Sequence, residues 1–194
     1  MARTTAFNPD EKLKDAMTLF WERGYDATSM QDIVETLAIN RFSIYNTFGD
    51  KRALYAQSMA LYIATCFTPF LSALQPHMDG LIAIKRYLKQ MERFLCSDIG
   101  LRGCLMCNNM SEQEFRDSEV TDKAVEAFAE LHAALVLALQ AAIDQGQCTR
   151  HRDAKACAEY IFTFVQGLNL LRKTGGRKAV KRNVKFLLTE LDTW

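Results

Sequence analysis

Hydrophobic side chains recur along most of the chain at the three- and four-residue spacing that places them on one face of an α-helix. After Ser29, a good helix N-cap, Met30, Ile33, Val34 and Leu37 follow at this spacing. No stretch shows the sustained alternation of Val, Ile and Thr that is typical of strands. The pattern therefore predicts an all-α protein.

The predicted helices number about nine and fall into two groups. Three short helices come first, at about residues 10–23, 29–37 and 41–48. Six longer ones follow, and glycines such as Gly24, Gly146 and the pair Gly175–Gly176 mark the ends of helices. The longer group begins at Lys51 and continues at about residues 81–96, 104–115, 118–145, 153–173 and 177–191.

Composition agrees with a soluble helical protein. The 194 residues include only 3 Pro and 9 Gly, and 49% of them are hydrophobic. The first 12 residues lack an apolar core, so we expect no signal peptide. Residues 53–78 carry no formal charge, but polar side chains and Pro69 interrupt them, so they predict a buried helix that breaks near Pro69 rather than a membrane span. We expect a cytoplasmic protein with no membrane partner.

The three short helices have the lengths and spacing of a helix-turn-helix unit, in which the last helix enters the major groove of DNA. On that third helix, Ile44 and Phe48 lie four residues apart and should pack inward. Phe42, Ser43 and Asn46 would then face the other way, toward the edges of the bases. The pattern predicts a surface that reads DNA.

Two further side chains are suited to phosphate contacts. The hydroxyl of Tyr45 lies at the edge of the predicted reading face, and Lys51 adds a cation at the start of the fourth helix. Bulk charge does not favour DNA, because the first 55 residues hold 7 Lys and Arg against 8 Asp and Glu, and the whole chain carries a net charge of +1. A helical interaction module that does not bind DNA therefore stays an alternative on pattern alone.

The residues themselves resemble the TetR family of bacterial transcriptional regulators. The resemblance is dense over about residues 6–66 and is carried by "LF..RGYDATSM..I", "SIYNTFGDK" and the "LY" that follows. It implies a helix-turn-helix DNA-binding domain over 6–66, with the motif at about 29–48, and a helical ligand-binding and dimerisation domain over 67–194. Members of the family bind palindromic operators as homodimers, usually repress, and release DNA when a small molecule binds the C-terminal domain.

The resemblance also implies roles for single residues. Ser29 and Met30 fall where family members touch the DNA backbone, and Lys51 matches a lysine that contacts it. Arg41 falls on the usual basic residue of the turn, and Tyr45 matches the tyrosine of the family pattern. Two positions depart from that pattern: Phe42 stands where a small residue is common, and Thr47 stands where a histidine is frequent. Phe42 suits either a contact with a thymine methyl group or a packing role at the start of the helix.

The C-terminal part has many large, flexible apolar side chains and a few amides. Methionine and aromatic side chains adapt to varied apolar ligands, although at helical spacing they more often form a core. Buried amides need partners, and a ligand is one possible partner. The candidate ligand-binding residues are Phe67, Phe70, Tyr87, Met91, Phe94, Met106, Asn109, Met110, Phe128 and Gln166.

The last two predicted helices, at about 153–173 and 177–191, resemble the dimerisation pair of the family. Two such helices from each subunit would make a four-helix interface, in which Gly167 permits close approach. Residues 172–185 include seven basic and no acidic residues. We interpret that run as a solvated surface rather than a second site for nucleic acid.

Cys104 and Cys107 form a C-x-x-C pair, which suits a redox couple, half of a zinc site, or simple packing. No strand is predicted before Cys104, and no second pair supplies four zinc ligands, so we expect no metal and no cofactor. The functional hypothesis is a thiol sensor at Cys104, because Gly103 suggests a helix start, where thiolates are stabilised. Some TetR-family regulators with a similar "GCL" stretch respond to electrophiles or oxidants, so an apolar or electrophilic effector is expected.

No motif of an enzyme stands out in the sequence. Patterns such as G-x-S-x-G, H-E-x-x-H and the P-loop do not occur. The sequence therefore predicts a regulator rather than an enzyme. A helical thiol-redox protein that uses the C-x-x-C pair is the alternative.

Overall fold

The computed structural model describes residues 7–75, 79–110, 119–148 and 153–194, and within these ranges all regular structure is helical. The chain divides into two compact units. The first unit comprises Met1–Cys66 and Leu105–Ala124, and the second comprises Phe67–Cys104 and Val125–Trp194. The all-α prediction is confirmed for the described residues.

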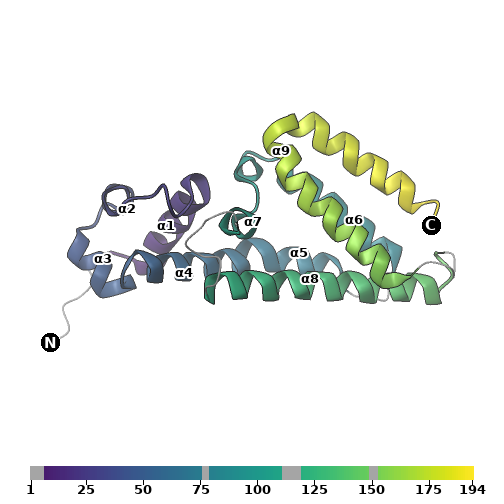
Figure 1. Cartoon of the computed structure of the whole chain (residues 1–194), viewed down its shortest axis with the longest axis horizontal. Coiled ribbons are helices and arrows are strands. Elements are labelled where there is room, and N and C mark those ends of the chain that lie inside the picture. Colours follow the sequence, from purple (N-terminus) through teal and green to yellow (C-terminus); the bar gives the residue numbers. More distant parts are fainter. Residues whose placement is uncertain (1–6, 76–78, 111–118, 149–152) are drawn as a thin grey trace. The chain divides into compact units, whose positions relative to one another are not determined.

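The first unit begins with four helices (Figure 1). They are α1 (Pro9–Arg23), α2 (Met30–Leu37), α3 (Arg41–Phe48) and α4 (Lys51–Tyr62). Side chains cap the start of each one. In each helix, a side-chain oxygen of the N-cap residue accepts a hydrogen bond from a backbone N–H of the first turn. The four N-cap residues are Asn8, Ser29, Asn40 and Asp50. These caps satisfy backbone groups that would otherwise be unpaired, so local sequence sets where the helices start.

Two tight links connect α1, α2 and α3. Gly24, with φ of 82°, ends α1, and its N–H donates to the carbonyl of Phe20. Ala38 ends α2 with φ of 51°, and it is the non-glycine residue of the described chain that has a positive φ. A left-handed alanine is strained, because its Cβ crowds the backbone. The link between α2 and α3 therefore holds some strain.

The core of the first unit is closed around an aromatic cluster. The Tyr55 ring lies 5.0 Å from Phe20 and 5.1 Å from Tyr25, measured between centroids. The short helix α7 (Leu105–Asn109) belongs to the same unit, where the Tyr55 hydroxyl donates to Asn109 Oδ1 at 3.1 Å. Asn109 Nδ2 in turn donates to Thr121 at 3.2 Å. These partners satisfy a buried amide that the sequence had suggested for ligand binding.

The break after α4 differs from the prediction. The sequence suggested a helix interrupted near Pro69, whereas a π-helical turn at Ile63–Phe67 comes first and α5 (Thr68–Ala73) follows it. Pro69 lies in the first turn of α5, where a missing N–H leaves no hydrogen bond unmade. The proline therefore starts a helix instead of breaking one.

The second unit is also helical. It comprises α5, α6 (Leu81–Leu95), the 3₁₀ turn η3 (Ile99–Arg102), the part of α8 (Glu119–Asp144) from Val125 onward, and α9 (Ala154–Leu191). The helix α6 packs against both α5 and α9. Arg172 of α9 is buried and donates from Nε to the Leu95 carbonyl at the end of α6 at 2.5 Å.

The predicted boundary between the last two helices is confirmed as a kink. Gly176 has φ of 69° and ψ of −172°, so α9 consists of two helical segments that meet there. The predicted helix at 104–115 is seen only as α7, and residues 111–118 lie outside the described residues. By length and composition, α8 is apolar enough to cross a membrane, but helices of soluble cores pass the same test, so this is weak evidence for a span.

Candidate nucleic-acid interface

The start of α2 is locked by a reciprocal capping box. Ser29 Oγ accepts a hydrogen bond from the Asp32 N–H at 3.1 Å, and Asp32 Oδ2 accepts one from the Ser29 N–H at 2.8 Å. Arg23 adds an ion pair to Asp32 at 2.6 Å. The hydrogen bonds from Ser29, with help from Arg23, hold the pKa of Asp32 below its ordinary value. Ser29 is exposed and Met30 is half-buried beside it.

The prediction that Ile44 and Phe48 form the inward face of α3 is confirmed. Ile44 is completely buried and Phe48 is only 5% exposed. The Asn40 side chain caps the helix by accepting from the Ser43 N–H at 2.8 Å. Because two buried side chains and a cap fix α3, its opposite face is held in a defined orientation within the unit.

The outward face of α3 carries six of the predicted contact residues. Phe42 is 73% exposed and Tyr45 is 43% exposed. Arg41, Asn46 and Thr47 are also exposed, and Ser43 is half-buried. A phenylalanine this exposed has little packing role within the unit, so the alternative that Phe42 caps the helix against a neighbour loses support.

Two cations are already organised by aromatic rings. The Arg41 guanidinium lies 5.7 Å from the Tyr45 ring centroid, and its Nη2 donates to the Tyr45 hydroxyl at 3.4 Å. The Lys51 ammonium lies 3.9 Å from the centre of the Tyr25 ring. The first contact links residues four apart on one helix, whereas the second links segments far apart in the sequence. Sequence reasoning missed Tyr25 for that reason.

The predicted ligand-binding residues are mostly buried. Phe67, Phe70, Tyr87 and Met91 are buried in the second unit, where Phe94, Phe128 and Gln166 are half-buried. Edge-to-face ring contacts join Phe70 to Phe94 at 5.3 Å and Phe67 to Phe128 at 5.9 Å. In the first unit Met106 and Asn109 are buried, and Met110 is 44% exposed.

None of the six cysteines, all of which lie in the described part of the chain, forms a disulfide. Cys104 is buried, and Cys107 is half-buried on the five-residue α7. Among the described residues, no cluster of His, Cys, Asp and Glu could hold a metal ion.

Two family profiles match the chain. The bacterial regulatory proteins of the tetR family match residues 13–57, which include α2 and α3. The tetracyclin repressor-like C-terminal domain matches residues 80–187, which is more than half of the chain. The chain belongs to the TetR family. It is a DNA-binding transcriptional regulator.

Curated relatives of the TetR-family chain include two that span most of its length. The HTH-type transcriptional repressor BdcR of Escherichia coli is 25% identical over 89% of this chain and 83% of its own. The HTH-type transcriptional regulator YezE of Bacillus subtilis is 27% identical over 99% of this chain and 100% of its own. Both relatives are named as transcriptional regulators.

Solved TetR-family structures share the fold. A triple cysteine mutant of the regulator CifR, in complex with a 26-bp double-strand operator DNA, has a TM-score of 0.83 at 23% identity and covers 97% of this chain and 98% of its own. The reduced form of NemR from E. coli has a TM-score of 0.74 at 18% identity and covers 93% of this chain and 96% of its own.

Proposed function

We propose that this regulator is a repressor that binds a palindromic operator as a homodimer through residues 6–66, with 67–194 as the ligand-binding and dimerisation domain. The observation that carries the proposal is the exposed face of α3, which is presented by the buried Ile44 and Phe48 in a segment that matches the family's N-terminal profile. BdcR is a repressor and CifR was solved on operator DNA, which supports the same role here. We place the protein in the bacterial cytoplasm.

Each predicted contact residue has a role that fits its exposure. Phe42, Ser43, Asn46 and Thr47 would meet the edges of bases in the major groove. In addition, Ser29 and Met30, at the start of α2, and Arg41, Tyr45 and Lys51 would contact phosphates. The ring contacts of Arg41 and Lys51 reduce the freedom that these side chains would lose on binding.

An apolar face of α9 supports the homodimer. Leu170 is 66% exposed, Phe186 is 60% exposed and Tyr160 is 45% exposed. A side chain added at Gly167 would meet nothing within 4 Å, so this glycine leaves room for a partner helix. A groove of 460 Å³ includes Tyr160 and Phe186 in its lining. Large apolar side chains that water surrounds in one chain favour association with a second copy.

The effector is proposed to be apolar or electrophilic. The aromatic side chains of the second unit would adapt to an apolar molecule. For an electrophile or oxidant, Cys104 is the proposed sensor, with Cys107 and Cys96 as partners for a disulfide. CifR, which was solved as a cysteine mutant, and NemR, which was solved in a reduced form, share this fold. These two neighbours support the proposal that a thiol of this chain responds to the effector.

Peroxide treatment tests the sensor. Hydrogen peroxide should release operator DNA from wild type and not from Cys104→Ser. Cys148→Ser is the matched control, because it removes another buried thiol. Equal release from wild type and Cys104→Ser would exclude a sensor at Cys104.

A gel shift with operator DNA tests the reading face. Tyr45→Phe should weaken binding about fivefold, because one hydrogen bond is worth roughly 1 kcal/mol. Lys51→Ala should weaken binding to all sequences and reduce the slope of affinity against salt by about one counterion. Lys155→Ala, an exposed lysine of α9 in the second unit, is the control and should bind as wild type does. Unchanged binding by both α3 and α4 variants would remove these residues from the interface.

A further inference from the structure

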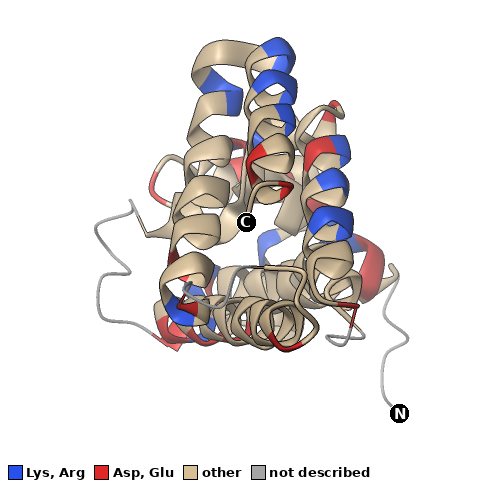
Figure 2. Ribbon diagram, turned by 90° about the vertical axis from the view of Figure 1, so that its right-hand side faces the viewer, with Lys and Arg blue, Asp and Glu red and all other residues tan. Residues whose placement is uncertain are grey.

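A basic groove lies between α6 and the last segment of α9 in the second unit. It has a volume of 870 Å³ and is open to solvent. Five cations line it, Lys85, Arg86, Lys89, Arg93 and Lys181, against the single acid Glu92. Figure 2 shows Lys and Arg gathered along neighbouring helices of this unit. The interpretation of residues 172–185 as merely a solvated surface leaves this groove unexplained.

Two of the five cations are already used within the unit. Lys85 forms an ion pair with Asp192 at the end of α9. Arg86 donates from Nε to the Ala73 carbonyl at 2.8 Å and from Nη2 to Asp79 at 2.8 Å, so it closes the end of α5. These contacts make Lys85 and Arg86 part of the structure rather than the main ligands of the groove.

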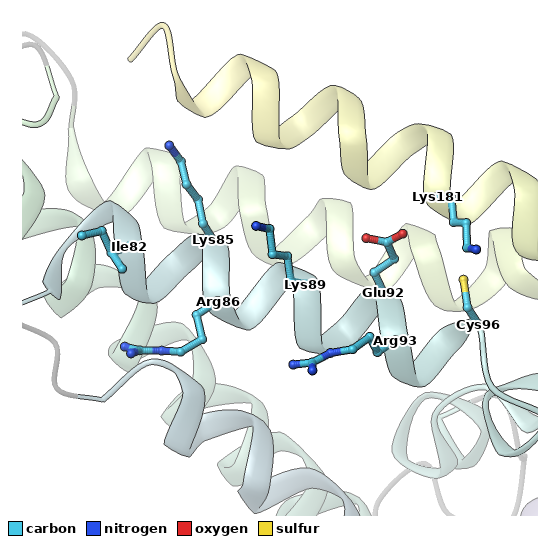
Figure 3. Close-up of a pocket in the computed structure, with 8 residues that line it drawn as sticks. All are labelled: Ile82, Lys85, Arg86, Lys89, Glu92, Arg93, Cys96 and Lys181. Atoms are coloured by element: carbon cyan, nitrogen blue, oxygen red, sulfur yellow. The ribbon is translucent and has the colours of Figure 1, made fainter.

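The other three cations have no ion-pair partner in the part of the chain that the structure describes. They are Lys89 and Arg93 of α6 and Lys181 of α9. Figure 3 shows Lys89 pointing from α6 toward the last segment of α9 and Lys181 pointing from α9 back toward α6 beside Cys96, with the Glu92 carboxylate between them, while Arg93 leaves α6 on the other side, as Arg86 does. Lys89 and Arg93 are one helical turn apart, which corresponds to a rise of about 6 Å. Like charges that line one open groove repel one another, and a bound anion would relieve that repulsion.

We propose that this groove binds a small molecule that carries two or more linked phosphate groups, which reach Lys89 and Lys181 on one side of α6 and Arg93 on the other. The volume suits a small molecule, since ligand sites usually measure about 300–1,000 Å³. Lysine supplies point charges to phosphate, and arginine supplies a planar fork of donors. A single phosphate would not reach all three cations, because they are spread along one helix and across to another. The site is separate from the operator-binding face and does not depend on it.

Titration calorimetry of the full chain at low salt, with sodium tripolyphosphate as the probe, tests the groove. Lys89→Gln combined with Lys181→Gln should weaken binding about fivefold, because two exposed charge pairs contribute roughly 0.5 kcal/mol each. The control, Lys155→Gln combined with Arg182→Gln, removes the same charge from exposed positions of α9 outside the groove and should leave affinity unchanged. Equal weakening in both pairs would show unspecific attraction and overturn the proposal.

Replacement of Glu92 gives a second test, in which binding should become tighter instead of weaker. Its carboxylate lies in the groove and has no ion-pair partner among the described residues, so it should repel a bound phosphate. Glu92→Gln should therefore tighten tripolyphosphate binding about twofold, an effect that loss of folding would not produce. Binding that Glu92→Gln weakens or leaves unchanged would contradict the site.

Two further probes define the chemistry. Inorganic phosphate should bind at least tenfold more weakly than tripolyphosphate, because one group cannot reach cations on both helices. Citrate with an affinity equal to that of tripolyphosphate would overturn the assignment to phosphate. No measurable binding of tripolyphosphate to wild type at low salt would overturn the site altogether, whether or not operator DNA binds.

Discussion

The first and second units differ in what fixes their helices. In the first unit, side chains cap α1, α2, α3 and α4, each within three residues of the cap. In the second unit, Asp153 caps α9 in the same way, but α5 begins without a side-chain cap and α6 begins on the distant Gln147, whose Oε1 accepts from the Leu81 N–H at 2.8 Å. Long-range contacts such as that of Arg172 with the Leu95 carbonyl also hold these helices. Neighbouring residues therefore set the helix starts of the first unit, whereas the second unit depends more on packing between distant segments, which leaves its exposed surface free to vary.

The largest expected effect separates the two faces of α3. Phe48→Ala should lower the free energy of unfolding by about 3–5 kcal/mol, because it leaves a cavity in the core. Phe42→Ala, on the same helix but 73% exposed, should change stability by less than about 0.5 kcal/mol and weaken operator binding. Urea unfolding and a gel shift check both. Similar loss of stability in the two variants would mean that Phe42 belongs to the core.

The next effect concerns the apolar face of the second unit. Phe186→Asp should shift the proposed dimer to a monomer, because a carboxylate would be buried against the proposed second copy. Sedimentation velocity measures the change, and Glu126→Gln on α8, an exposed position that is not apolar, is the control. If Phe186→Asp sediments like wild type, α9 is not the dimer face at this position.

The smallest effect concerns the strained link in the first unit. Ala38→Gly should raise the free energy of unfolding by roughly 0.5–1 kcal/mol, since relief of the left-handed alanine exceeds the extra entropy of an unfolded glycine. Ala27→Gly, at an exposed position that no positive φ favours, is the control and should lower stability or leave it unchanged. A lower stability for Ala38→Gly in urea would contradict the strain.

Local signals account for what the sequence predicted well. Helical spacing and caps placed α1, α2, α3 and the start of α4 within a residue or so, and they identified Ile44 and Phe48 as core. The Ser29 and Asp32 pair could have been found as a capping box, because the two residues stand three apart. Contacts between distant segments, such as Lys51 with Tyr25, leave no such local signal.

The second unit shows more clearly what sequence patterns could not predict. The sequence predicted the break at Gly176, but it could not predict that basic residues of α6 and Lys181 of α9 line one groove, since only packing brings the two helices together. It also placed the break after α4 at Pro69, where the π turn at Ile63–Phe67 stands instead. The side chains suggested for a ligand pocket remain a prediction.

A hydroxyl-radical footprint on the DNA beside the protein's own gene tests the central claim that α3 reads an operator. The account predicts two protected segments centred a whole number of helical turns apart, about 10 bp per turn, with both protections weakened together in Lys51→Ala. Protection that is absent at every protein concentration, or that is unchanged in the Tyr45→Phe and Lys51→Ala variants, would contradict it.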